Sequence, residues 1–203
     1  KLVTGTMRAD AGTVELNGQD VSRRSEVQRC RLGMSQTMQH ASLFASMTVT
    51  ETVALAVQRH SGRRIGLLPR RRPEIRERAE ELLVDVGLAG RSNVVVQSLA
   101  HGERKQLEVA LALACNPSLL LLDEPAAGMS PAERARLVEL VHGLPAEVTV
   151  LFVEHDLDLV FALADAVTVL HLGRVLLSGA ASGAWFGLFV GLLLSMFSAG
   201  TKS

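Results

Sequence analysis

Apolar positions along the chain follow two alternating spacings. Short continuous apolar runs, typical of buried strands, are separated by longer segments whose apolar positions recur every three or four residues, as they do on helices. In the second half of the chain this pattern predicts strands at 119–122, 148–153, 166–170 and 175–178 and helices at 102–115, 130–142 and 157–164. Apolar strands that alternate with helices predict an α/β fold with a parallel core sheet covered on both faces.

The first part of the chain has a different pattern. Residues 13–16 alternate in polarity and are followed by Asn17-Gly18 and Val21, which together are typical of an antiparallel hairpin. A further strand is predicted at 33–38, and Gln39 follows it. We therefore expect an antiparallel β flap at the front of the parallel sheet.

Helix starts and stops mark a helical subdomain at about 40–115. Thr48 and Glu51 have the spacing of a capping box, which opens a helix to about residue 58. The next helix is predicted to begin at Pro73 and to close at Gly87, because proline suits the first helical position and glycine the residue beyond the end. Ser130 and Glu133 form a second predicted capping box, outside this subdomain.

Acidic and histidine side chains follow two of the predicted strands. Asp123 and Glu124 come directly after the strand at 119–122, and His155 follows the strand at 148–153. Ligands of parallel α/β sheets bind beyond the carboxyl ends of the strands. Adjacent carboxylates there suit Mg²⁺ binding and the activation of a water molecule, although each motif taken alone also fits an ordinary solvated strand end.

The order of four motifs resolves that ambiguity. Gln39 follows an early strand, Leu99 to Glu103 open a helix, Asp123 and Glu124 end the next strand, and His155 ends the one after it. This arrangement resembles the nucleotide-binding subunit of ABC transporters, over residues 1–179. A DNA-repair ATPase of the same type would carry a long coiled coil between Gln39 and Leu99, and that segment is too short to hold one.

The resemblance implies a role for each matching residue. Glu124, His155 and Gln39 match the catalytic glutamate, the switch histidine and the Q-loop glutamine, and Asp123, with Gln39, matches the Mg²⁺ ligands. ATP bound by a partner subunit would be contacted by the helix start and the following D-loop: Ala100, His101, Gly102, Glu103 and Ser130. The implied ligands are therefore ATP and Mg²⁺, and the implied reaction is ATP hydrolysis.

The amino-acid sequences of several segments resemble those of one subfamily, the branched-chain amino-acid uptake ATPases. These segments lie at 39–44, 122–128 and 154–160, and a basic insertion at 58–73 also resembles that group. The resemblance implies an importer subunit at the cytoplasmic face of the cell membrane, peripherally attached. It also implies three partners: transmembrane permease subunits, a second ATP-binding subunit and, indirectly, a substrate-binding protein.

Two positions depart from the family pattern. The glycine-rich phosphate loop, G-x-x-x-x-G-K-[ST], is absent from the sequence, and in relatives it would precede Thr4. We expect that the sequence begins within the domain and that this chain alone is inactive. Ala100 stands where the family usually has serine. The alternative function is a non-hydrolysing or regulatory module that docks on a partner without binding ATP.

Composition adds few further constraints. A formal net charge of +0 gives no indication of nucleic-acid binding. Cys30 and Cys115 lie far apart without metal-ligand spacing, which favours a reducing cytoplasmic compartment and a buried structural thiol at Cys115. The basic segment 63–72 fits a solvated loop or a contact with anionic lipid. The uncharged tail at 180–203 fits a sequence junction, a membrane anchor or a buried helix.

Overall fold

The computed structural model describes residues 1–37, 45–60 and 73–181. Gln39, the basic segment at 63–72 and most of the apolar tail lie outside these residues. The chain divides into two compact units, one spanning residues 1–153 and the other beginning at Glu154. Within the described residues no helix is both long enough and apolar enough to cross a membrane.

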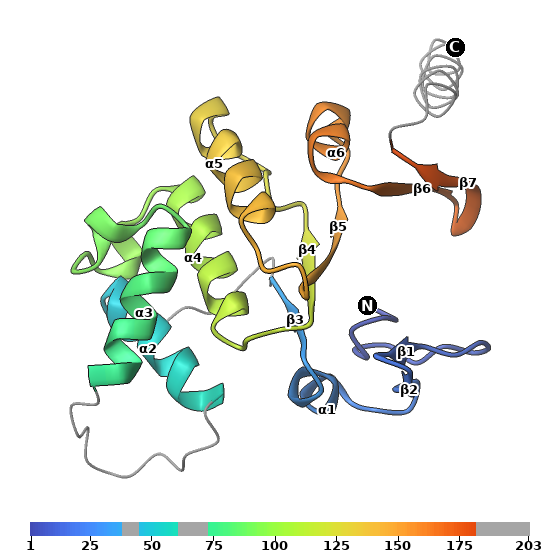
Figure 1. The fold of residues 1–203 in the computed structure, drawn as a ribbon, viewed down its shortest axis with the longest axis horizontal. Helices are drawn as coiled ribbons and strands as arrows, with labels where there is room; N and C mark the ends of the chain where they lie inside the picture. The colour runs from blue at the N-terminus through green and yellow to red at the C-terminus, as the bar shows by residue number, and fades with distance from the viewer. Residues whose placement is uncertain (38–44, 61–72, 182–203) are drawn as a thin grey trace. The chain divides into compact units, whose positions relative to one another are not determined.

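The first unit contains a three-stranded parallel sheet in the order β3-β4-β5 (Figure 1). Its strands are β3 (Met34–Gln36), β4 (Leu119–Asp123) and β5 (Thr149–Val153). The central strand β4 is buried from Leu120 to Leu122, as predicted for an apolar strand covered on both faces. The prediction fails for β5, where Leu151 is 47% exposed and Val153 is 61% exposed.

The front of the first unit contains a small hairpin and a short helix. Strands β1 (Glu15–Leu16) and β2 (Gln19–Asp20) pair antiparallel. The turn between them has positive φ at Asn17 and Gly18, which is why an Asn-Gly pair is favoured there. The helix α1 (Glu26–Arg31) was not predicted from the sequence, although Ser25 and Gln28 form a complete capping box at its start.

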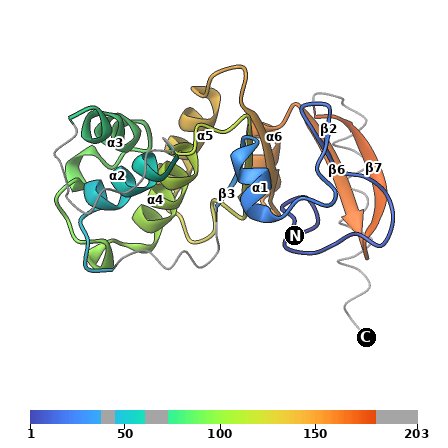
Figure 2. The same cartoon turned by 90° about the horizontal axis from the view of Figure 1, so that it is seen from below.

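Three helices make up the helical part of the first unit: α2 (Val49–His60), α3 (Pro73–Asp85) and α4 (His101–Leu113). Two 3₁₀ turns, Ala89–Arg91 and Val96–Ser98, connect α3 to α4. Figure 2 shows the three helices side by side. Their shared core is almost fully excluded from solvent and includes Val49, Val53, Leu82, Leu83 and Leu107. Burial of these apolar side chains is the main force that holds α2, α3 and α4 together.

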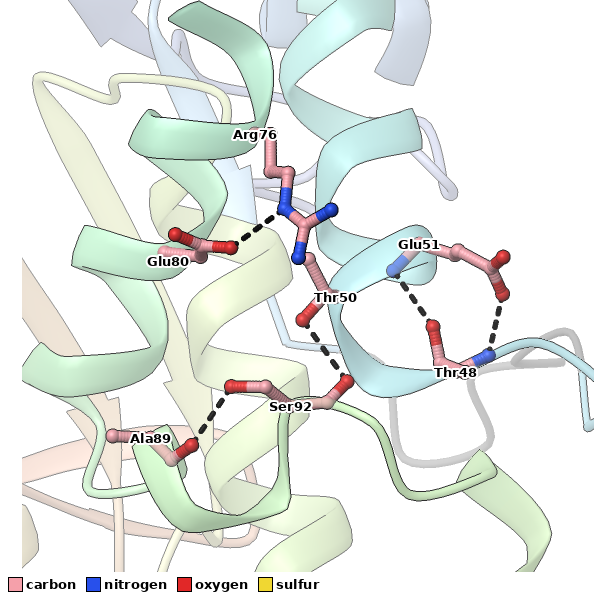
Figure 3. A network of polar contacts seen from close by, with 7 residues as sticks. All are labelled: Thr48, Thr50, Glu51, Arg76, Glu80, Ala89 and Ser92. Carbon is pink, nitrogen blue, oxygen red and sulfur yellow. Dashed lines mark hydrogen bonds and ion pairs between the residues drawn. The ribbon is translucent and has the colours of Figure 1, made fainter. Parts of the chain in front are cut away.

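Polar contacts fix how α2 begins against the chain that follows α3 (Figure 3). The predicted capping box is present: the Glu51 amide donates to Thr48 Oγ1 (3.2 Å) and the Thr48 amide donates to Glu51 Oε2 (2.9 Å). Hydrogen bonds to the Glu51 carboxylate from the backbone and the side chain of Thr48 lower the pKa of Glu51. Thr50 Oγ1 donates to the Ser92 carbonyl at 2.9 Å, so α2 is also tied to the connection between α3 and α4.

The second unit contains α6 (Leu157–Leu163) and a hairpin of β6 (Ala166–His171) and β7 (Arg174–Ala180). The sequence pattern placed 166–170 among the parallel strands, and that prediction is wrong. In the described chain β6 pairs antiparallel with β7. The turn between them has positive φ at Leu172 and Gly173, which reverses the chain at once and leaves no crossover helix between the strands.

Candidate nucleotide site

The two candidate carboxylates Asp123 and Glu124 lie at the carboxyl end of β4. Asp123 is the last residue of the strand and is exposed, and its backbone is paired with Val153 of β5. The Asp123 amide also donates to Thr37 Oγ1 at 3.4 Å. Thr37 continues β3, since its own amide donates to the Leu121 carbonyl at 2.9 Å. The ends of three neighbouring strands therefore meet at Asp123.

Glu124 has an unusual backbone conformation. Its φ is +47°, in the left-handed region that costs a residue with a side chain about 1–2 kcal/mol. The Glu124 amide donates to the Val153 carbonyl at 2.9 Å, which extends the pairing of β4 with β5 by one residue. Such strain persists only where the surrounding structure enforces it, and it is concentrated at functional sites. Glu124 is therefore held in a fixed orientation directly after the exposed Asp123.

The candidate histidine belongs to the second unit. His155 is exposed over 78% of its side chain, and its Nδ1 lies 3.9 Å from Oε2 of Glu154, whose own side chain is 2% exposed. Asp156 caps α6 by accepting from the amides of Asp158 and Leu159. The structure thus brings Asp123 and Glu124 together on one strand, whereas His155 lies in the other unit and Gln39 outside the described residues.

The segment Leu99 to Glu103 forms the start of α4. Ala100 is the N-cap residue, and because it has no hydroxyl, no side chain caps the helix there. The reciprocal half of a capping box is present, because the Ala100 amide donates to Glu103 Oε2 at 2.9 Å. The other carboxylate oxygen of Glu103 accepts from Arg91 Nε at 2.6 Å. The first-turn amides thus lie at a helix N-terminus, where backbone N–H groups and the helix dipole attract anions.

The start of α4 faces the start of α5 (Pro131–His142). A Cβ added to Gly102 would lie 2.0 Å from Oε1 of Glu133, and one added to Gly128 would lie 2.6 Å from the imidazole of His101. Two glycines therefore allow the two helix starts to approach each other closely. Gly128 has a φ of +74°, so its conformation also favours glycine.

Ser130 caps α5, the role that sequence analysis described as a capping box. Its Oγ accepts from the Glu133 amide at 3.4 Å, and the Ser130 amide donates to Glu133 Oε2 at 2.8 Å. The Ser130 hydroxyl also donates to the same carboxylate at 2.7 Å. These hydrogen bonds lower the pKa of Glu133, with smaller contributions from Arg136 and His101. The role of Ser130 towards ATP stays a prediction.

Two residues of this region were missed by sequence analysis. Thr37 falls within the predicted strand at 33–38, and its hydroxyl oxygen accepts from the Asp123 amide. Glu133 was predicted only as a helix cap, although its carboxylate also lies over Gly102. The spacing of Gly128, Ser130 and Glu133 was visible in the sequence, but it carries no information about which helix the carboxylate faces.

The carboxylate oxygens at the end of β4 are ligands of the kind that Mg²⁺ uses. Within the described residues no group of three or more acidic, histidine or cysteine side chains could hold a metal. Mg²⁺ does not need such a group, because it is commonly held by one or two carboxylates, with water and substrate phosphates completing its coordination. The exposed carboxylate of Asp123 meets that requirement.

A parallel sheet with adjacent carboxylates at the end of its central strand, next to a helical subdomain, is the architecture of an ABC-type ATPase. The family model for ABC transporters matches residues 1–127. The chain belongs to the ABC transporter family, which confirms the family and the α/β ABC ATPase fold predicted from its motifs.

Curated relatives and solved structures agree with this assignment. The high-affinity branched-chain amino acid transport ATP-binding protein LivG of Escherichia coli K12 is 35% identical over 186 residues, which cover 87% of this chain and 73% of LivG. BraF of Pseudomonas aeruginosa, with the same description, is 33% identical over the same share of each chain. The solved ATP-binding cassette MJ1267 of an ABC transporter matches with a TM-score of 0.77 and 26% identity, over 88% of this chain and 73% of MJ1267.

Proposed function

We propose that this chain is the ATP-hydrolysing subunit of an ABC importer for branched-chain amino acids. The substrate class is supported by the similarity to LivG and BraF, both described as branched-chain amino acid transport ATP-binding proteins. Nucleotide binding is supported by MJ1267, which has been solved in an ADP conformation at 26% identity to this chain. The import direction rests on the resemblance of segments 39–44, 122–128 and 154–160 to branched-chain amino-acid uptake ATPases.

The observation that carries the proposal is the pair of carboxylates at the end of β4. Asp123 is exposed and would hold Mg²⁺, which supplies positive charge to the phosphates when bound. Glu124 follows it in a strained conformation fixed by the bond to Val153. Its carboxylate would accept the proton of the attacking water. Gln39 would assist in placing the metal and this water, and His155 would contact the terminal phosphate.

The start of α4 would act on the ATP of a second subunit. Ala100 to Glu103 present the first-turn amides of the helix, and Ser130 begins the neighbouring α5. A complete site would therefore need two ATP-binding subunits, together with transmembrane permease subunits and, indirectly, a substrate-binding protein. In this arrangement the chain is attached peripherally at the cytoplasmic face of the membrane.

The proposal is tested with Glu124→Gln in a chimera that joins a relative's phosphate-loop segment to Lys1. The amide keeps the shape of the side chain but cannot take a proton, so turnover should fall by roughly 10²–10⁴-fold while Mg-ATP stays bound. The control is Glu147→Gln, the same chemical change at an exposed position outside the sheet. Unchanged turnover would contradict the role of Glu124, and lost binding would indicate a metal ligand instead.

A second candidate function is a regulatory module that does not hydrolyse ATP. The motif that would hold the ATP phosphates, G-x-x-x-x-G-K-[ST], does not occur within residues 1–203. Without the lysine and the loop amides, Mg-ATP should bind to this chain weakly or not at all. Calorimetry on the 203-residue chain separates the two functions. Micromolar affinity would show that the phosphates are held by other groups, whereas absent binding together with an active chimera supports the ATPase.

A further inference from the structure

Two thiols that are far apart in the sequence lie at corresponding distances before two paired strands of the sheet. Cys30 precedes β3 by the same number of residues as Cys115 precedes β4. The first residues of these two strands, Met34 and Leu119, are direct partners in the parallel register. The backbone between each cysteine and its strand is also tied together, because the amide of Ser118 donates to the Gly33 carbonyl at 2.8 Å.

The two cysteines belong to the wall of the same small cavity. Cys30 and Cys115 both line a cavity of about 250 Å³ between α1, β3 and α4. Its wall is largely apolar and includes Met34, Leu111 and Ala112. Both cysteines are half-buried and neither is in a disulfide. The cavity has ample room for a molecule the size of water beside the two sulfurs.

The thiols are close enough to affect each other's protonation. Burial raises the pKa of Cys115, Cys30 raises it further by its charge and by a hydrogen bond, and a hydrogen bond with Ser35 has the opposite effect. The raised pKa disfavours the thiolate form of Cys115. Because thiolates are the nucleophiles in thiol chemistry, this raised pKa makes Cys115 a poor first nucleophile.

We propose that Cys30 and Cys115 form a peroxide-sensitive dithiol site that closes to an intramolecular disulfide. The Cys30 thiolate attacks one oxygen of hydrogen peroxide, the O–O bond breaks, and Cys30 becomes a sulfenic acid with release of hydroxide. The Cys115 sulfur then attacks the sulfenic sulfur, forming the S–S bond and releasing water. In total, two thiols are oxidised, one peroxide is reduced, and two waters form.

The disulfide would join α1 to the end of α4. Cys30 lies in α1, and Cys115 lies just beyond the last residue of α4. The N-terminal end of α4, at His101, lies beside the start of α5. A cross-link at the C-terminal end of α4 would therefore fix that end of the helix to α1 and leave its first turn unaltered. This inference concerns the thiols alone and does not depend on ATP hydrolysis.

The test treats the chain with stoichiometric hydrogen peroxide and then alkylates the denatured protein with iodoacetamide. The number of alkylated thiols should fall from two to none, and dithiothreitol should restore both. After trypsin, a linked product should contain the dipeptide Cys30-Arg31 joined to residues 106–134, with a mass lower by two hydrogens than the sum of its parts. These masses identify the bond directly, whatever its effect on activity.

The matched controls are Cys30→Ser and Cys115→Ser. Each keeps one thiol and cannot form the internal bond. Under the same treatment, Cys115→Ser should yield a sulfenic acid at Cys30, whereas Cys30→Ser should react far more slowly. Either of two results would overturn the proposal: both thiols of the parent chain remaining alkylatable, or a non-reducing gel showing dimers in place of the internal cross-link.

Discussion

The starts of α4 and α5 face each other but are capped differently. At α5, Ser130 and Glu133 complete a reciprocal capping box, whereas at α4 Ala100 and Glu103 form only the half that needs no hydroxyl. The boxes at α1 and α2 are also complete. At the helix start that matches the ABC signature, the first-turn amides thus receive no side-chain oxygen from their own N-cap. This is consistent with a start that is reserved for an anion from outside the chain.

The largest effect on this pair of helix starts is expected from Gly102→Ala. The new Cβ would lie 2.0 Å from Glu133 Oε1, and the Ser130 hydrogen bonds hold that carboxylate in place. Overpacking of this kind costs about 1–3 kcal/mol. Alanine's better helix propensity offsets only about 1 kcal/mol of that cost. We therefore expect a lower free energy of unfolding, measured by urea denaturation.

A double variant isolates the contact between Gly102 and Glu133. With Glu133→Ala in the background the clash is removed, so Gly102→Ala should become neutral or stabilising. The effect of Gly102→Ala on the free energy of unfolding is compared with Glu133 present and with Glu133→Ala. The difference between these two values measures how closely the two helix starts approach. If Gly102→Ala stabilises the chain with Glu133 present, the close approach of α5 to α4 is wrong.

The next largest loss of stability is expected from Ser130→Ala, which makes the start of α5 resemble that of α4. Loss of the N-cap hydroxyl should reduce the free energy of unfolding by about 1 kcal/mol. Ser130→Thr keeps the oxygen and serves as the control. A loss of the same size in both variants would mean that packing, and not the hydrogen bond to Glu133, accounts for the effect.

The converse change is Ala100→Ser, which would complete the box at α4. A serine there should raise the free energy of unfolding by about 0.5–1 kcal/mol, because its oxygen can accept from the Glu103 amide. Ala100→Val, which adds bulk without a donor or acceptor, is the control. No gain with serine would show that the backbone at Ala100 does not let a hydroxyl reach the first-turn amides.

The smallest effect is expected in the pH dependence of stability. Hydrogen bonds from Ser130 lower the pKa of Glu133 below its usual value of 4.5 in the folded chain. The stability that this provides is complete above that usual value and is lost as the pH falls through the folded pKa. Ser130→Ala should therefore reduce the acid sensitivity of stability, as measured from unfolding at neutral pH and at about pH 3. An unchanged pH profile would contradict the bonding assigned to Glu133.

Features that depend on neighbours along the chain were predictable from the sequence. The capping boxes at Thr48 and Ser130 are confirmed, because a side chain there bonds an amide only three residues away. The position of Asp123 at the end of a buried strand is confirmed as well. Helix α1 was missed because its six residues offer too few apolar positions to show helical spacing, although Ser25 and Gln28 were visible.

Features that depend on distant pairing were not predictable. The hairpin of β6 and β7 was assigned to the parallel series because an apolar strand has the same appearance in either kind of sheet. The proximity of Cys30 to Cys115 follows from the register of β3 on β4, which no spacing within one segment reveals. The approach of Glu133 to Gly102 likewise requires two helix starts to be placed in space.

The buried guanidinium of Arg29 links the first residues of the chain to α1. Arg29 is 2% exposed, and it donates to four backbone carbonyls, those of Leu2, Val3, Ser22 and Arg24. The lysine ammonium lacks the planar, multi-donor geometry with which a guanidinium reaches several carbonyls at once. Lysine could therefore not replace arginine at position 29. Opening the first residues would break several charge-assisted bonds at once, so hydrogen exchange there should follow the opening of α1 as one cooperative unit.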